Sequence, residues 1–257
     1  MLGNRSAKQV LCALVEKTHY IAFVSMFRVY KNVPDAFRRY LLGKGEYPVS
    51  ISINTPVGLR DVRLYSHHDM LTVNEIFCRN DYPVDRNLRV VVDIGSNIGL
   101  SASFFMTRNN QARCYLFEPD PKNVGRLRQQ LKSFEGRYEL EECAVSDFDG
   151  KVTFGVENTG RYGGIGVKTE QEIAVECRHI NGVLREVIGR ERVIDVVKID
   201  TEGAEIATVK TIDAELLRNI RRIFIEAHPE EDLLPGKFKQ QQYGSICQLA
   251  NVELGRV

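Results

Sequence analysis

The sequence lacks a surplus of charge of either sign, and it lacks closely spaced cysteines. Lys and Arg total 35 against 34 Asp and Glu, a formal net charge of +1, whereas nucleic-acid binders are usually strongly basic. The nearest two of the six cysteines, Cys114 and Cys143, are 29 positions apart, so no CxxC or zinc-ligand spacing occurs. We therefore expect no nucleic-acid partner, and single thiols in a reducing, cytoplasmic compartment.

Long apolar runs are also missing. Near the N-terminus, Glu16, Lys17, His19 and Arg28 interrupt the apolar residues, so no stretch approaches the roughly 18–20 residues of a membrane span. No small-residue cleavage site follows an apolar region, and we predict no signal peptide. Residues 1–47 hold eight Lys/Arg against three Asp/Glu. We expect residues 1–46 to form a helical cap that packs on the main domain or joins copies of the chain into a homo-oligomer. Peripheral contact with an anionic membrane surface is the alternative.

The rest of the chain predicts an α/β fold. With 43% apolar and 27% charged residues, the composition is typical of globular proteins. Alternating residues around 54–58 predict a β-hairpin, and from residue 88 strands rich in Val, Ile and Leu alternate with helices. Such strands indicate a doubly wound, mostly parallel sheet covered on both faces. We expect one domain over 47–257 with its core at 88–230, an inserted hairpin and lid at 150–178, and a last helix near 238–250.

A glycine-rich turn follows the first strand of this sheet. The strand ends at Asp93 and runs through Gly95, Asn97 and Gly99 into a helix, so a ligand can approach the backbone closely. Such a turn is a weak signal alone, because dinucleotide-binding proteins share it. Asp93 would disfavour a pyrophosphate there. It suits a ligand with an ammonium group, such as the amino-acid end of S-adenosylmethionine.

Acids also follow the next two predicted strands. Glu118, beside Pro119, comes 25 positions after Asp93, where a carboxylate can accept hydrogen bonds from ribose hydroxyls. Asp147 follows the third predicted strand, over 138–146, and is expected to meet the adenine amino group. One such acid is often only a helix N-cap. Three at successive strand ends favour a nucleoside ligand, and Asp93 favours the methyl donor.

Five segments then occur in a familiar order. They are Asp93-Ile-Gly-Ser-Asn-Ile-Gly99, Phe117-Glu-Pro-Asp-Pro121, Ala144-Val-Ser-Asp147, Lys198-Ile-Asp-Thr-Glu-Gly-Ala-Glu205 and Ile225-Glu-Ala-His-Pro229. Over about residues 50–230 the chain resembles the FkbM family of S-adenosylmethionine-dependent methyltransferases. The resemblance implies a class I methyltransferase fold and, commonly, O-methylation of sugars, glycolipids, glycopeptides or polyketide-type natural products. The last two strands of a complete seven-stranded sheet are not evident, which keeps a non-catalytic nucleoside-binding module open.

Methyl transfer to a hydroxyl requires alignment of the reacting atoms and a base that removes the proton. Candidates follow the fourth and fifth strands, which flank the methyl group. We predict Asp200 and His228 as catalytic residues, and Glu202 and Glu226 as substrate contacts. Capping the helix that begins near Gly203 is the alternative role of Asp200. Asp200, Glu226 and His228 suit a divalent cation poorly, and we predict no metal site.

Further substrate contacts are predicted outside these strand ends. Arg161 and Tyr162 lie in the glycine-rich loop of the inserted hairpin, a candidate lid over the acceptor. His68, in a strand-to-helix turn, is a candidate for the substrate cleft. The acceptor is expected to be a small molecule, glycan or lipid. N-methylation on the same core is the nearest rival, and an NAD-dependent oxidoreductase is disfavoured because the chain has no G-x-G-x-x-G fingerprint.

Overall fold

The structure is a computed structural model that describes residues 17–157, 163–167, 169 and 171–254. The chain divides into two compact units, Met1–Pro83 and Val84–Val257, which are described separately. The hairpin near residue 55 thus shares a unit with the N-terminal helices, whereas the sequence grouped it with the region 47–257. No helix in the described part of the chain is long and apolar enough to cross a membrane.

The first unit contains the predicted helices and hairpin. Its elements are α2 (Lys17–Val29), α3 (Val33–Leu42), β1 (Val49–Thr55), β2 (Gly58–Leu64), α4 (His67–Val73) and the π-helix η1 (Asn74–Arg79). Helix α3 begins where Asn32 accepts a hydrogen bond from the Asp35 amide, and it ends at Gly43 with a left-handed φ of 61°. Local capping signals therefore account for the boundaries of this helix.

An aromatic cluster lies on helices α2 and α3. The rings of Phe23, Phe27 and Phe37 have centroids 4.9–5.9 Å apart, and Phe27 is 60% exposed. Arg28, Lys31 and Arg38 are exposed on or beside the same helices. The predicted contact between copies, or with a membrane surface, concerns these helices and stays a prediction.

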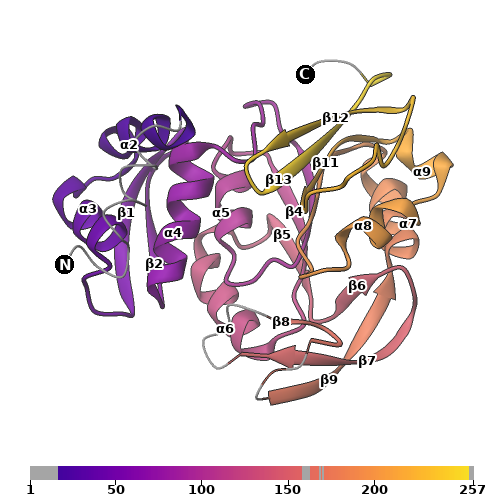
Figure 1. The fold of residues 1–257 in the computed structure, drawn as a ribbon, viewed down its shortest axis with the longest axis horizontal. Helices are drawn as coiled ribbons and strands as arrows, with labels where there is room; N and C mark the ends of the chain where they lie inside the picture. The colour runs from indigo at the N-terminus through magenta and orange to yellow at the C-terminus, as the bar shows by residue number, and fades with distance from the viewer. Residues whose placement is uncertain (1–16, 158–162, 168, 170, 255–257) are drawn as a thin grey trace. The chain divides into compact units, whose positions relative to one another are not determined.

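The second unit is built on a seven-stranded sheet. Its strands are β3 (Val90–Ile94), β4 (Arg113–Phe117), β5 (Tyr138–Glu141), β10 (Ile194–Ile199), β11 (Ile220–Glu226), β12 (Phe238–Tyr243) and β13 (Ile246–Asn251), in the spatial order β12-β13-β11-β10-β3-β4-β5. Neighbours from β11 to β5 are parallel, and β13 runs antiparallel to both β11 and β12 (Figure 1). The predicted doubly wound fold with a mostly parallel sheet is confirmed.

The predicted helix at 238–250 is wrong. These residues form the hairpin β12–β13, which turns at Gly244, where φ is 59°. The hairpin completes the seven-stranded sheet whose last two strands the sequence did not reveal. A non-catalytic nucleoside-binding module was kept open because these two strands were not evident, and that reason no longer applies.

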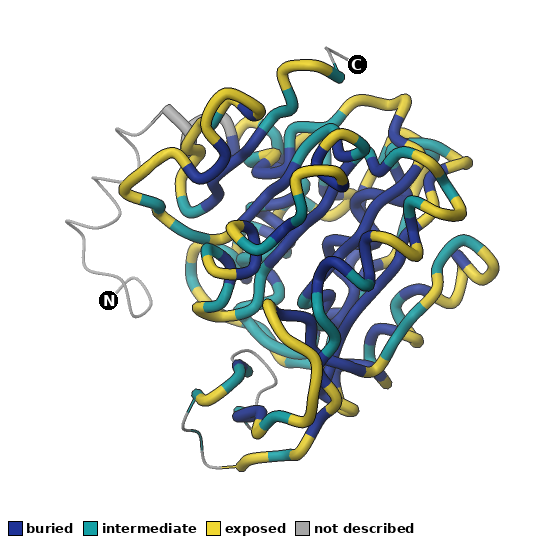
Figure 2. Tube along the Cα trace, turned by 90° about the vertical axis from the view of Figure 1, so that its right-hand side faces the viewer, coloured by how far each residue is buried: buried dark blue, intermediate teal, exposed yellow. Residues whose placement is uncertain are grey.

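Helices cover both faces of this sheet. Helices α5 (Leu100–Met106) and α6 (Pro121–Gln130) lie on one face, and α7 (Ile180–Glu191), α8 (Glu205–Lys210) and α9 (Ala214–Leu217) on the other (Figure 1). A short 3-10 helix, η2 (Lys132–Phe134), follows α6. The central strands β3, β4, β10 and β11 are mostly buried between these layers, as the dark blue tube in Figure 2 shows. Val90, Val92 and Ile94 belong to the core cluster that contains α7, so Asp93 points to the face of α5.

A second sheet arises from the insertion. The predicted strand 138–146 divides into β5 and β6 (Ala144–Ser146), and β6 pairs with β9 (Gln171–His179). Strands β7 (Gly150–Val156) and β9 form the predicted antiparallel hairpin, with β8 (Gly163–Ile165) beside β7. Arg178 of β9 donates to both carboxylate oxygens of Glu141, at 2.8 and 2.6 Å, and this links the second sheet to β5.

Candidate active site

The carboxyl ends of β3, β4 and β10 meet at a left-handed turn. Gly95, Asn97 and Gly99 have φ of 75°, 49° and 83°, and the amide of Gly95 donates to the carbonyl of Phe117 at 3.0 Å. A Cβ on Gly95 would overlap the carbonyl oxygen of Asp200. Glycine is therefore required at this position for both its conformation and its size. The turn lies at the edge of the sheet where doubly wound folds bind their ligands.

Asp93 is fully buried and has partners on two elements. It is the register partner of Lys198 on β10, and their charged atoms lie 3.0 Å apart. Its other carboxylate oxygen accepts a hydrogen bond from Ser101 of α5 at 2.6 Å. The Lys198 ammonium also donates to the Gly95 carbonyl at 2.9 Å and lies 3.4 Å from Asp200. One buried cation thus bridges the turn and the end of β10.

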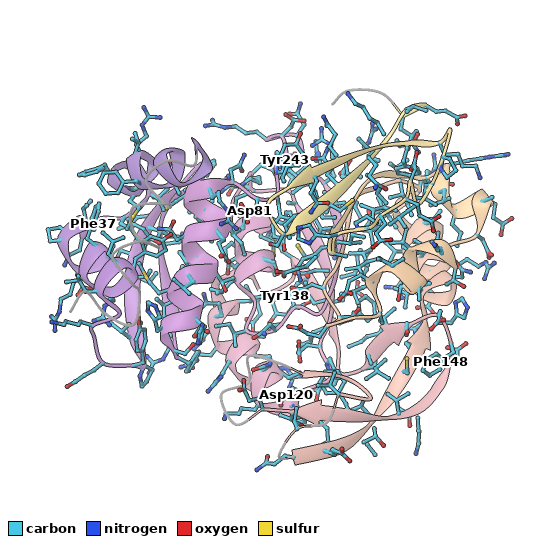
Figure 3. The ribbon with its side chains drawn as sticks, in the orientation of Figure 1. Phe37, Asp81, Asp120, Tyr138, Phe148 and Tyr243 are labelled. Atoms are coloured by element: carbon cyan, nitrogen blue, oxygen red, sulfur yellow. The ribbon has the colours of Figure 1, made fainter. Side chains whose placement is uncertain are left out.

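Glu118 follows β4 and lies beneath the same turn. Its carboxylate accepts the backbone amides of Asn97 at 2.7 Å and Asp120 at 2.9 Å. Burial raises the pKa of Glu118 to about 7, against the lowering effect of these two hydrogen bonds. A carboxylate has about four lone-pair sites, so sites for two further donors remain. Asp120, labelled in Figure 3, caps α6 by accepting the Lys122 amide, and Pro119 is buried between the two acids.

Asp200 directly follows β10, as predicted. Its amide donates to the carbonyl of Ile94 at 3.1 Å, and its side chain is 29% exposed. Burial raises the pKa of the Asp200 carboxyl, while Lys198 acts in the opposite direction. The alternative role, capping the next helix, is not what the structure has, because α8 begins at Glu205 after Ala204.

The loop between Asp200 and α8 is held by Glu205. Its carboxylate is buried and accepts the amides of Thr201 at 2.8 Å and Gly203 at 3.0 Å. Glu202, in the middle of this loop, is exposed with a left-handed φ of 57°. A Cβ on Gly164 of β8 would lie 3.3 Å from the Cβ of Glu202. The inserted sheet therefore reaches the loop that follows β10.

Glu226 and His228 lie at the end of β11, where both are exposed. His228 borders an open hollow of about 600 Å³. Asp232 and strand β12 form much of its remaining wall. His228 lies at the strand end, as predicted, and its catalytic role stays a prediction.

The remaining predicted residues lie elsewhere. Asp147 is exposed and follows β6, which belongs to the second sheet. The sequence had instead placed this residue at the end of the third strand of the parallel sheet. Arg161 and Tyr162 lie outside the described residues. His68 is the second residue of α4, in the first unit. Across the described residues, no group of three or more His, Cys, Asp or Glu side chains is arranged to hold a metal ion.

Lys198 and Ser101 were not among the predicted site residues. A signal existed for Lys198, because a lysine between the apolar residues Val197 and Ile199 of the strand before Asp200 is expected to be buried and to need a counter-charge. Its register with Asp93 depends on strand order, which the sequence alone does not fix.

The geometry can now be compared with known proteins. A family model described as the methyltransferase FkbM domain matches residues 93–248, from the turn through β13. The chain belongs to the FkbM methyltransferase family. The match includes both strands of the C-terminal hairpin in part or whole, so these strands are within the family's domain.

Three named proteins are similar to this chain in sequence. The 2-O-methyltransferase NoeI of Sinorhizobium fredii is 30% identical over 166 residues, which cover 58% of this chain and 66% of NoeI. The methyltransferase sdnD of Sordaria araneosa is 26% identical over 183 residues, covering 56% of this chain and 68% of sdnD. The AMB antimetabolite synthetase AmbE of Pseudomonas aeruginosa is 27% identical over 229 residues, covering 71% of this chain and 10% of AmbE. The chain thus spans about a tenth of AmbE and about two thirds of NoeI and sdnD.

Solved structures with related folds are more distant in sequence. An rRNA methylase from Streptococcus thermophilus is 11% identical, with a TM-score of 0.38 over 73% of this chain and 96% of its own. A caffeoyl-CoA O-methyltransferase homologue from Staphylococcus aureus is 10% identical, with a TM-score of 0.39 over 70% and 90% of the two chains.

Proposed function

We propose that this FkbM protein is an S-adenosylmethionine-dependent O-methyltransferase that acts on a hydroxyl of a sugar, glycolipid or natural-product acceptor. The observation that carries the proposal is the partly exposed carboxylate of Asp200, whose backbone carbonyl packs against Gly95 of the glycine turn at the carboxyl edge of the sheet. The name of the relative NoeI, a 2-O-methyltransferase, supports a hydroxyl acceptor.

The residues at this edge fit the methyl donor. Glu118 retains lone pairs that can accept two hydroxyl donors such as those of a ribose. Gly95 and Asn97 are partly exposed residues, so this turn can contact a ligand directly. Pro119 and Gly99 are further proposed contacts of the donor, and Asp147 stays a predicted contact of its adenine. When bound, the donor supplies an electrophilic methyl group on a sulfonium.

Asp200 is the proposed general base. A hydroxyl is a weak nucleophile until its proton is removed, and a base whose pKa is raised toward the working pH removes it most efficiently. Burial raises the pKa of Asp200, and its partial exposure leaves it reachable from the cleft. The positive charge of Lys198 favours the ionised form of this carboxyl.

The acceptor side is proposed to include Glu202, Glu226 and His228, which are exposed and follow β10 and β11. Arg161, Tyr162 and His68 stay predicted acceptor contacts. Strand β8 lies beside the Glu202 loop, which supports a role of the inserted sheet in covering an acceptor.

Two measurements test this function. Calorimetric titration with S-adenosylhomocysteine is expected to give micromolar binding, roughly −8 kcal/mol. Transfer of labelled methyl from S-adenosylmethionine is then measured on monosaccharides, glycolipids and secondary alcohols, with amines in parallel. Asp200→Asn is expected to keep the affinity for S-adenosylhomocysteine and to lose methyl transfer by about a hundredfold or more.

Glu215→Gln is the matched control, because Glu215 is an exposed acid on α9, and it should change neither measurement. Absence of binding to the wild type would refute the methyltransferase function. Transfer to amines alone would replace O-methylation by N-methylation.

A further inference from the structure

Asp93 and Lys198 form a closed charge pair in the middle of the donor site. They are direct partners on neighbouring parallel strands, and both side chains are at most 4% exposed. Because β3 and β10 are parallel and in register here, the two side chains point to the same face of the sheet. The hydroxyl of Ser101 on α5 donates a hydrogen bond to the second carboxylate oxygen of Asp93.

The charges around Lys198 do not cancel. Its ammonium has three N–H donors, and oxygens of Asp93, Gly95 and Asp200 lie within 3.4 Å. One positive and two negative side chains leave one negative charge. Asp93 is fully buried and Asp200 is 29% exposed, so the uncompensated charge belongs to the carboxylate that faces the cleft.

An ammonium group of a ligand gains little at Asp93 under these conditions. The charge of Asp93 is already balanced, and a second cation beside it would lie within a few ångströms of Lys198 and be repelled. Glu118 differs, because its two partners are neutral backbone amides. The structure therefore separates two acids that look equivalent in the sequence.

We propose that Asp93 serves as the buried counter-ion of Lys198 and not as a ligand of the donor's ammonium group, and that Lys198 is the positioning residue that ties the donor turn to Asp200. The inference rests on the proposed function. It replaces the direct role that the sequence analysis gave to Asp93.

The pair makes a specific prediction for charge removal. Lys198→Met leaves Asp93 buried without a counter-ion, and the melting temperature should fall by roughly 10 °C. Asp93→Asn removes the nearer counter-ion and leaves Lys198 paired with Asp200 alone, so the melting temperature should also fall, but by less. The double variant Asp93→Asn/Lys198→Met removes both charges and should recover most of the loss, because a buried pair can be replaced by neutral groups at little cost.

Donor affinity decides between the two roles of Asp93. If Asp93 is only the counter-ion, the double variant binds S-adenosylhomocysteine within about threefold of the wild type. If Asp93 contacts the ammonium group, the double variant loses affinity by at least about tenfold, as expected for a charged hydrogen bond, and the inference is overturned. Failure of the proposed function is distinguishable, because the wild type itself would then not bind.

A third readout separates positioning from structural support. The charged groups that face Asp200 are Lys198 on β10, Asp93 on β3 and Glu205 on α8, and among these three Lys198 alone is a cation. A carbon-13 titration of the aspartate carboxyls, with Asp200→Asn for assignment, should show the Asp200 pKa moving upward in the double variant. Lys198→Arg should keep it near its wild-type value. An unchanged Asp200 pKa in the double variant would overturn the positioning role.

An exposed ion pair provides the control. Arg128 and Glu142 lie 2.7 Å apart with side chains 57% and 47% exposed. Arg128→Met/Glu142→Gln should leave the melting temperature and the affinity unchanged, because exposed pairs contribute little.

Discussion

The backbone of Gly95 lies against the carbonyl oxygen of Asp200, with no space for a side chain between them. The amide of Asp200 also donates to the carbonyl of Ile94 at 3.1 Å, next to the same glycine. The turn proposed to hold the donor and the residue proposed to activate the acceptor are therefore parts of one packed contact. A substitution that displaces the Gly95 turn is therefore expected to displace Asp200 as well, and the reverse.

Gly95→Ala tests this contact. Alanine at a φ of 75° is strained, and its Cβ would overlap the Asp200 carbonyl, so we expect a loss of roughly 3 kcal/mol in unfolding free energy. Binding of S-adenosylhomocysteine should be lost as well. Urea denaturation and calorimetry measure the two effects.

Gly125→Ala is the matched control for this substitution. Gly125 is an exposed residue within α6, and a Cβ there would meet nothing within 4 Å. We expect a gain of about 0.5–1 kcal/mol from helix propensity, with unchanged binding. Equal behaviour of the two variants would contradict the proposed packing of Gly95.

The affinity for S-adenosylhomocysteine should depend on pH through Glu118. Hydroxyl donors need the ionised carboxylate, and with a pKa of about 7 only about a tenth of the sites are ionised at pH 6. The affinity should therefore rise about tenfold from pH 6 to pH 8. Calorimetric titrations across this range measure it.

Glu118→Gln is the comparison for the pH effect. Its affinity should be lower at pH 8 and should vary little between pH 6 and pH 8, because the titrating group is gone. An unchanged pH dependence in this variant would assign the effect to another residue.

Glu205→Ala should loosen the loop that carries Glu202. The carboxylate of Glu205 accepts hydrogen bonds from the amides of Thr201 and Gly203, and charged hydrogen bonds contribute about 1.5–3 kcal/mol. We expect a loss of about 2–3 kcal/mol in denaturation and faster hydrogen exchange over residues 201–204. Glu215→Ala, an exposed acid with one partner at 3.5 Å, should cost less than about 1 kcal/mol. A similar loss in both variants would argue against the anchoring role.

The parallel part of the sheet was predictable because its strands carry a strong local signal. Val90–Ile94 and Ile194–Ile199 are nearly continuous in Val and Ile, which is typical of strands buried on both faces. The hairpin β12–β13 was not predicted, because Lys239 and three consecutive glutamines have good helix propensity. Pairing of β12 with β13, which itself pairs with β11, overrides that preference, and Gly244 was the local sign of the turn.

The site was predictable to the level of strand ends and no further. Asp93, Glu118 and Asp200 all lie at the carboxyl edge where the sequence placed them. Which atoms they contact depends on neighbours that are far apart in the chain, such as Lys198, which follows Asp93 by 105 positions. For Asp147, the strand before it joined another sheet, and no local pattern distinguishes the two pairings.

The strand order β12-β13-β11 also has a consequence for folding during synthesis of the chain on the ribosome. Strand β13 lies between β11 and β12, although it follows both in the sequence. On the ribosome, β11 has an open edge until residues 246–251 have been synthesised, and unpaired apolar edges recruit other chains. Buried residues such as Ile223 and Ile225 belong to that strand. Translation that stops before residue 246 therefore yields a nascent chain in which the edge of β11 is unpaired. Chaperones must bind such a chain, or proteases must degrade it, to prevent aggregation.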